Sequence, residues 1–192
     1  MLELDHVICC VPDQGAFDPT GFTLEPGQVH AGQGTRNVRV MFDRNYLEVL
    51  WIDDAEALAR SGLDFAARCV RPARAVPFGC VLRGAIPAEL RARFVPYPLP
   101  GAPGVVLMRL ADQSAEAPFV AVFEVDESEA RWPARRFAPD YLVHPGGATR
   151  ILRATFTCPA PLALGELADV QFAPGPARLD LALGDAALAV VA

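Results

Sequence analysis

Residues 30–53 read HAGQGTRNVRVMFDRNYLEVLWID, and this stretch decides the fold. Within it, residues 36–42 alternate and are rich in β-branched side chains, residues 43–45 are turn formers, and residues 46–52 are strand-like again. Two such runs joined by a short turn predict a β-hairpin. Because side chains alternate across a strand, Tyr46 and Glu48 are expected on one face of the second strand.

Glu48 is a lone carboxylate in the middle of a strand whose two faces are otherwise apolar. Burying an unpaired carboxylate costs several kcal/mol, roughly, even after the surroundings relax. The sequence therefore predicts that a metal ion, a role as a base, or an arginine compensates the charge of Glu48.

The composition of the 192 residues predicts one globular domain, because 52% of the residues are hydrophobic and only 21% are charged. The net charge of −6 argues against binding to nucleic acid or to an anionic membrane. Five cysteines without a C-x-x-C motif fit neither a disulfide framework nor a zinc pattern. No signal peptide is recognisable, and no apolar run reaches the roughly 18 residues of a membrane span, so we expect a cytoplasmic protein.

Residues 2–11 predict a strand that begins the chain and carries His6 in an apolar setting, with Leu4 and Ile8 on the same face. His6 is therefore either a core histidine or a site residue. Residues 55–70 predict a helix that is broken at Gly62 or split in two there, with Asp54 among the residues placed to cap its start.

One plan recurs about three times along the chain. Residues 2–52, 77–125 and 150–191 each read as a strand, a connector and further strands, with helical turns expected at 87–94 and 162–168. We predict an α+β fold in which βαβββ modules form a curled mixed β-sheet cup with flanking helices. Within a single domain over residues 1–192, module 1 spans about 1–53, module 2 about 77–125, and a C-terminal partial repeat about 149–192.

Four motifs resemble the vicinal oxygen chelate superfamily of glyoxalases, bleomycin-resistance proteins and extradiol dioxygenases. They are LDHVICCVPD at residues 4–13, H-x-G-x-G-T-x-N at 30–37, YLEV at 46–49 and HPGGA at 144–148. The glyoxalase-like domain branch is the most similar. The resemblance implies that two modules curl eight strands into a cup. It also implies a divalent metal inside, held by one residue from the first and one from the last strand of each module.

Carried over by this resemblance, His6 matches the first-strand ligand and Glu48 the last-strand ligand of module 1. An imidazole with a carboxylate suits Zn, Mn, Fe, Co or Ni. In module 2, Cys80 falls where His6 does, and Glu124 lies three residues beyond the position opposite Glu48. Three alternatives stay open: Cys80 or Glu124 completes the metal site, water and substrate complete it, or no metal binds.

Five further residues are candidates for binding a substrate. The loop with His30, Thr35 and Asn37 either approaches a small oxyanion or carbonyl with its backbone N–H groups or is a glycine-rich turn that satisfies its own backbone. Tyr46 is expected to donate a hydrogen bond in the pocket. His144 either lines the mouth of the cup, as the resemblance implies, or lies in a surface turn.

Three functions follow from these observations. The first is a metal-dependent lyase, isomerase or dioxygenase in which Glu48 is a ligand or a catalytic base. The second is a non-catalytic module that binds or sequesters a small molecule, as bleomycin-resistance proteins do, and the third is a degenerate structural or dimerisation domain. The expected partner is a small molecule, with a homodimer as an open alternative and with no nucleic acid or membrane.

Overall fold

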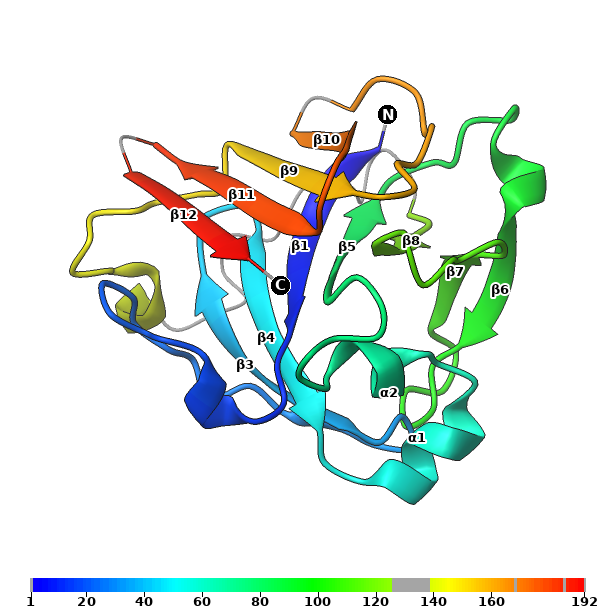
Figure 1. Ribbon diagram of the computed structural model, residues 1–192, viewed down its shortest axis with the longest axis horizontal. Helices are drawn as coiled ribbons and strands as arrows, with labels where there is room; N and C mark the ends of the chain where they lie inside the picture. The colour runs from blue at the N-terminus through cyan, green and yellow to red at the C-terminus, as the bar shows by residue number, and fades with distance from the viewer. Residues whose placement is uncertain (1, 126–138, 168, 185, 192) are drawn as a thin grey trace.

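The computed structural model describes residues 2–125, 139–167, 169–184 and 186–191. Its central feature is an eight-stranded mixed sheet in the order β2-β3-β4-β1-β5-β8-β7-β6 (Figure 1). The strands are β1 (Glu3–Cys10), β2 (Val29–His30), β3 (Thr35–Met41), β4 (Tyr46–Ile52), β5 (Phe78–Arg83), β6 (Phe94–Pro98), β7 (Val106–Leu110) and β8 (Phe119–Phe123).

The sheet consists of two four-stranded halves with the same internal order. β1 pairs with β4 in parallel, β5 pairs with β8 in parallel, and the two halves meet where β1 and β5 pair antiparallel. This arrangement confirms the predicted curled mixed sheet of repeated modules. The hairpin predicted from residues 30–53 is also confirmed, because β3 pairs antiparallel with β4.

The helices expected between the strands of module 2 are smaller than predicted. Only a 3-10 turn, Arg91–Arg93, forms within residues 87–94, and β6 then begins at Phe94. The helix prediction was wrong because pairing of β6 with β7 takes the end of this segment into the sheet. No helix forms in residues 161–167 either.

Two short helices follow β4 and lie at one end of the cup (Figure 1). They are α1 (Ala55–Ser61) and α2 (Phe65–Arg68), and they are separated where Gly62 takes a left-handed conformation with φ of 74°. The Asp54 carboxylate accepts hydrogen bonds from two backbone N–H groups and caps α1. The predicted break at Gly62 and the cap by Asp54 are therefore confirmed.

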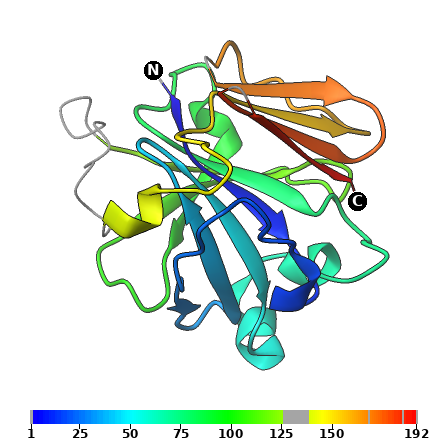
Figure 2. The same cartoon turned by 90° about the vertical axis from the view of Figure 1, so that its left-hand side faces the viewer.

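The C-terminal residues form a separate four-stranded sheet. Its strands are β9 (Arg153–Cys158), β10 (Val170–Pro174), β11 (Arg178–Leu183) and β12 (Ala186–Val191), in the order β10-β9-β11-β12. Figure 2 shows it as a layer of its own beside the large sheet. Its buried residues Phe156, Leu179 and Leu181 share one apolar core with Val7 and Val49 of the large sheet, so it covers the convex side of the cup.

The large sheet therefore has two differently covered faces. Ile8, Leu50 and Val81 point to the concave side, where they pack in a cluster with α1 and α2, and the alternate residues point to the convex core. A register shift between Leu4 and His6 marks a β-bulge in β1. Because of this bulge Leu4 joins the convex core with Val7 and does not share the face of His6 as expected. None of the helices in the described ranges is long and apolar enough to cross a membrane.

Candidate functional site

The site is built around Glu48 on the concave face of β4. Its Oε2 lies 3.3 Å from His6 Nε2, and its Oε1 lies 3.4 Å from His30 Nε2. Asn37 Nδ2 donates a hydrogen bond of 2.5 Å to Glu48 Oε1. Three residues from three other strands of the sheet thus meet at the carboxylate of Glu48, a residue that is only 5% exposed.

Backbone and hydroxyl contacts orient the groups that face Glu48. The backbone N–H of Gln28 donates to Asn37 Oδ1 at 2.8 Å, which turns the amide nitrogen of Asn37 toward Glu48. His30 Nδ1 is hydrogen-bonded to Thr35 Oγ1 at 2.9 Å, so its Nε2 faces the same carboxylate. The polar loop therefore satisfies its own backbone and also supplies donors to the site.

His6 is held on both of its ring nitrogens. Its Nδ1–H donates to Asp5 Oδ1 at 2.7 Å, and Tyr46 stacks on its ring with centroids 4.4 Å apart. Asp5 occupies the bulge of β1, which lets its carboxylate reach back to the neighbouring imidazole. Behind Asp5, Arg83 Nη1 lies 3.6 Å from Asp5 Oδ2.

The charges of this cluster are fixed by its contacts. Burial opposes protonation of His6, but its hydrogen bonds to Asp5 and Glu48 and the charges of both carboxylates outweigh burial and raise the pKa of His6 to about 9. Burial likewise opposes ionisation of Glu48, but the hydrogen bond from His6, the charges of His30 and His6 and the hydrogen bond from Asn37 lower the pKa of Glu48 to about 2. At neutral pH the two groups therefore face each other as an imidazolium and a carboxylate.

A cavity of about 150 Å³ opens in front of this cluster. The polar residues on its wall come from module 1 and include His6, His30, Asn37, Arg39 and Glu48. The opposite wall is apolar except for the Tyr97 hydroxyl, which is buried and makes no hydrogen bond within the described ranges, and it comes largely from module 2 and the helical segment: Leu63, Phe65, Val81, Tyr97, Leu99, Leu107, Phe119 and Phe123. The cup therefore offers one polar and one apolar wall to whatever it binds.

The second half of the sheet does not supply the expected metal ligands. Cys80 points to the convex core, where it is fully buried, because its neighbour Val81 takes the concave face. Glu124 lies on the same side of the chain as Val120 and Val122, which face the convex core, and its carboxylate forms an ion pair with Arg91. The predicted grouping of Glu124 with His6 and Glu48 is therefore not what the structure shows. In the described part of the chain, no three His, Cys, Asp or Glu side chains gather in a way that could hold a metal ion.

His144 lies outside the cavity and has a structural position. Its Nδ1 accepts a hydrogen bond from the backbone N–H of Thr23 at 3.1 Å, and its Nε2 donates to the carbonyl of Met41 at 2.7 Å. Phe22 and Phe42 pack edge-on against its ring. The expectation that His144 lines the mouth of the cup is therefore corrected: the ring is buried and links three separate segments.

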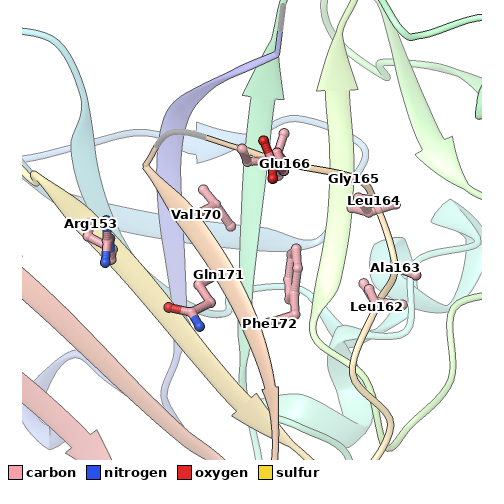
Figure 3. A pocket seen from close by; sticks show the side chains of 10 residues that line it. Arg153, Leu162, Ala163, Leu164, Gly165, Glu166, Val170, Gln171 and Phe172 are labelled. Carbon is pink, nitrogen blue, oxygen red and sulfur yellow. The ribbon is translucent and has the colours of Figure 1, made fainter.

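A larger but shallower groove of about 700 Å³ lies over the C-terminal sheet (Figure 3). Its lining is mostly apolar and includes Leu164, Val170 and Phe172, with Arg153 and Glu166 as its charged residues. Both charged residues are exposed. We place the candidate site in the smaller cavity, because there several buried polar groups converge on one point.

Two residues of the site were missed at the level of sequence. Asp5 was assigned by alternation to the opposite face from His6, and only the bulge brings the two together. Arg39 lines the cavity and is held by Glu25 through a contact of 2.5 Å between Arg39 Nε and Glu25 Oε2. Arg39 lies opposite Glu48 in the antiparallel pairing of β3 and β4, so the hairpin register was a signal that could have found it.

Comparisons with known proteins agree with the fold. The family model described as "Glyoxalase-like domain" matches residues 4–167. A crystal structure of a hypothetical protein from Staphylococcus aureus is similar at 14% identity and a TM-score of 0.56, over 92% of this chain and 88% of that one. A hypothetical protein from Bacillus halodurans is similar at 16% identity and a TM-score of 0.44, over 66% of this chain and 96% of that one. No curated protein matches the chain.

Proposed function

Because the chain belongs to the glyoxalase-like domain family, we propose that its cup binds a small organic molecule between the polar wall of module 1 and the apolar wall of module 2. The observation that carries this proposal is the cavity of about 150 Å³ in front of the Glu48 cluster. A concave, largely apolar site with a few convergent polar groups is the usual form of a small-molecule pocket.

The protonation states favour binding over proton transfer. A catalytic acid or base works best when its pKa lies near the operating pH. The pKa of Glu48 is about 2 and that of His6 is about 9, so neither group exchanges a proton readily at neutral pH. The pair is therefore suited to orienting a ligand, and of the three functions considered we propose the non-catalytic binding module.

One observation favours the metal-dependent alternative. His6 and His30 both direct Nε2 toward Glu48 while Asp5 and Thr35 hold their Nδ1 atoms, and metal-binding histidines are commonly oriented in this way. The donors present do not complete a site, since the facing wall adds apolar groups such as Val81 and Phe119 and, within the described residues, no His, Cys, Asp or Glu side chain. We therefore derive no metal-dependent step.

An NMR screen tests the binding function. Ring compounds of about ten or fewer non-hydrogen atoms, which suit the cavity, are titrated into isotope-labelled protein. We expect saturable shifts for cup residues such as Glu48 and Phe119, with an affinity that changes in Glu48→Gln and stays at the wild-type value in Glu124→Gln, whose side chain lies outside the cup. If no compound in the set perturbs the cup, the proposal fails.

Metal analysis of protein purified without chelator tests the alternative. Under the binding proposal, the wild-type protein and Glu48→Gln contain the same substoichiometric amounts of Zn, Mn, Fe, Co and Ni. Stoichiometric metal in the wild type that is lost in both His6→Ala and Glu48→Gln would replace the proposed function with the metal-dependent enzyme.

A further inference from the structure

We infer that the cup selects a neutral, planar, ring-sized ligand with a hydrogen-bond donor and acceptor side by side on one edge, as in a carboxamide or a lactam. This inference rests on the proposed binding function and names the class of ligand that the same site takes. It is carried by three features of the cavity: its size, the pairing of its charges and its free amide groups.

The size and the apolar wall point to a single ring. A cavity of about 150 Å³ holds a molecule the size of benzene. Phe65, Phe119 and Phe123 line the apolar side, and aromatic side chains pack well against the face of a flat ring.

The charged groups at the cup are already paired with one another. Glu48 faces His6 at 3.3 Å, and Arg39 contacts Glu25 at 2.5 Å. Asp5 contacts both His6 and Arg83. A charged ligand would add an uncompensated charge to a half-apolar cavity, which is costly. A neutral ligand avoids this cost.

The polar groups left for a ligand are two carboxamides, those of Gln28 and Gln33, and the buried hydroxyl of Tyr97, which makes no hydrogen bond within the described ranges. Gln28, which is exposed, and Gln33, which is half-buried, line the cavity, and their side-chain amides make no hydrogen bond to any residue within the described ranges. A side-chain amide offers a donor and an acceptor next to each other. A carboxamide or lactam edge on the ligand complements this pattern with two hydrogen bonds.

Benzamide, benzoate and benzamidine form a matched series that isolates the charge. All three are flat, of nearly equal volume, and differ in being neutral, anionic and cationic. We expect saturable binding of benzamide to the wild-type protein, tighter than that of either charged analogue by at least about tenfold, because burial of an unpaired charge is unfavourable. The affinities are measured by NMR titration at about pH 6, below the ordinary pKa of an imidazole.

Substitution of Glu48 tests the pairing of charges directly. In Glu48→Gln the cup loses its anion and keeps His6, so the preference should move toward benzoate by about tenfold relative to benzamide. The control Glu124→Gln, outside the cavity, should keep the wild-type order. Thermal melting checks that both variants fold.

The outcomes separate this inference from the proposed function. Tighter binding of benzoate or benzamidine to the wild-type cup overturns the inference and leaves small-molecule binding intact. Absence of binding by all three, with other ring compounds perturbing the cup in the broader screen, also overturns the inference alone. Absence of any cup ligand in both experiments overturns the proposed function itself.

Discussion

At the scale of single residues, the central finding is how the charge of Glu48 is compensated. The sequence led us to expect a metal ion, a base role or an arginine beside this charge, and the structure places His6, His30 and Asn37 around the carboxylate. Each of these groups is in turn held by a neighbour. The result is a connected polar network inside an apolar frame, in which every member depends on the others.

The ion pair between His6 and Glu48 makes stability depend on pH. Because the pKa of His6 is raised from 6.5 to about 9, the contribution of the pair is fully present below pH 6.5 and is lost as the pH rises through 9. Because the pKa of Glu48 is lowered from 4.5 to about 2, the contribution is present above pH 4.5 and is lost as the pH falls through 2. The two shifts share the His6–Glu48 contact, which is counted once, while Asp5 also raises the pKa of His6 and His30 and Asn37 also lower the pKa of Glu48.

We therefore predict that Glu48→Gln lowers the free energy of unfolding most between about pH 4.5 and 6.5, by about 3 kcal/mol. Urea unfolding over a series of pH values measures this difference. The matched control Glu124→Gln should follow the wild-type pH profile. A difference between wild type and Glu48→Gln that does not change with pH would refute the ion pair.

His144 should matter for stability and not for binding. His144→Ala removes a donor to the buried carbonyl of Met41 and an acceptor for the partly buried N–H of Thr23, and it leaves both backbone groups without these partners. We expect a loss of about 2–4 kcal/mol in the free energy of unfolding, with the affinity for a cup ligand unchanged. Denaturation and ligand titration of the same sample measure both, and a weakened affinity in the folded variant would return His144 to the site.

At the scale of elements, the position of the polar loop depends on a close contact with α1. Gly34 has a φ of 73°, and its carbonyl accepts hydrogen bonds from the N–H groups of Asp53 and Asp54. A Cβ at this position would lie 2.2 Å from the backbone nitrogen of Leu58. Glycine is therefore required here for packing of the loop on the helix.

Gly34 and Gly62 have nearly the same φ but different surroundings. Alanine substitutions at these two positions therefore distinguish the free-energy cost of the left-handed conformation from the cost of lost packing. Gly62 has a φ of 74° and nothing within 4 Å of an added Cβ. We expect Gly62→Ala to cost about 1–2 kcal/mol, from the left-handed conformation alone. Gly34→Ala should cost clearly more and also shift the NMR signals of His30 and Thr35. Equal melting temperatures for the two variants would contradict the predicted packing of the loop.

At the scale of the whole molecule, the cup depends on the C-terminal sheet for its outer core. The large sheet places Val7, Val49 and Cys80 on its convex side, and the C-terminal sheet buries them. A curled sheet with both faces apolar needs a layer on each side. In this chain helices and the cavity lie on the concave side, and a second sheet covers the convex side.

We predict that Phe156→Ala destabilises the cup and the C-terminal sheet together. Phe156 is fully buried in the shared core, and its truncation should cost about 3–5 kcal/mol. Phe172→Ala, at the partly buried ring that stacks on it with centroids 5.5 Å apart, is the control and should cost less. Far-UV circular dichroism and the NMR signals of His6 should report one common transition. Separate transitions would show that the cup folds without the C-terminal sheet.

Local patterns in the sequence were sufficient for much of the first half of the chain. Alternation placed Tyr46 and Glu48 on one face of β4, and turn chemistry and capping located the hairpin and the start of α1. The motifs around His6 and Glu48 led to the family and to the curled sheet. These features depend on residues that are near one another in the chain, so their signal is visible without the fold.

The tertiary structure alone decided which distant groups meet. A β-bulge, which the alternation of side chains does not predict, brings the Asp5 carboxylate to His6. The alternation of side chains along β8 directs Glu124 away from the cup. His144 found its partner Thr23 across 121 positions of sequence. Such contacts depend on strand register and on packing between distant segments, and neither can be read from the spacing of residues along the sequence. The sequence of residues 30–53 therefore predicted one wall of the site. The opposite, largely apolar wall consists of residues that lie far away in the chain, and only the tertiary structure places them in front of the first wall.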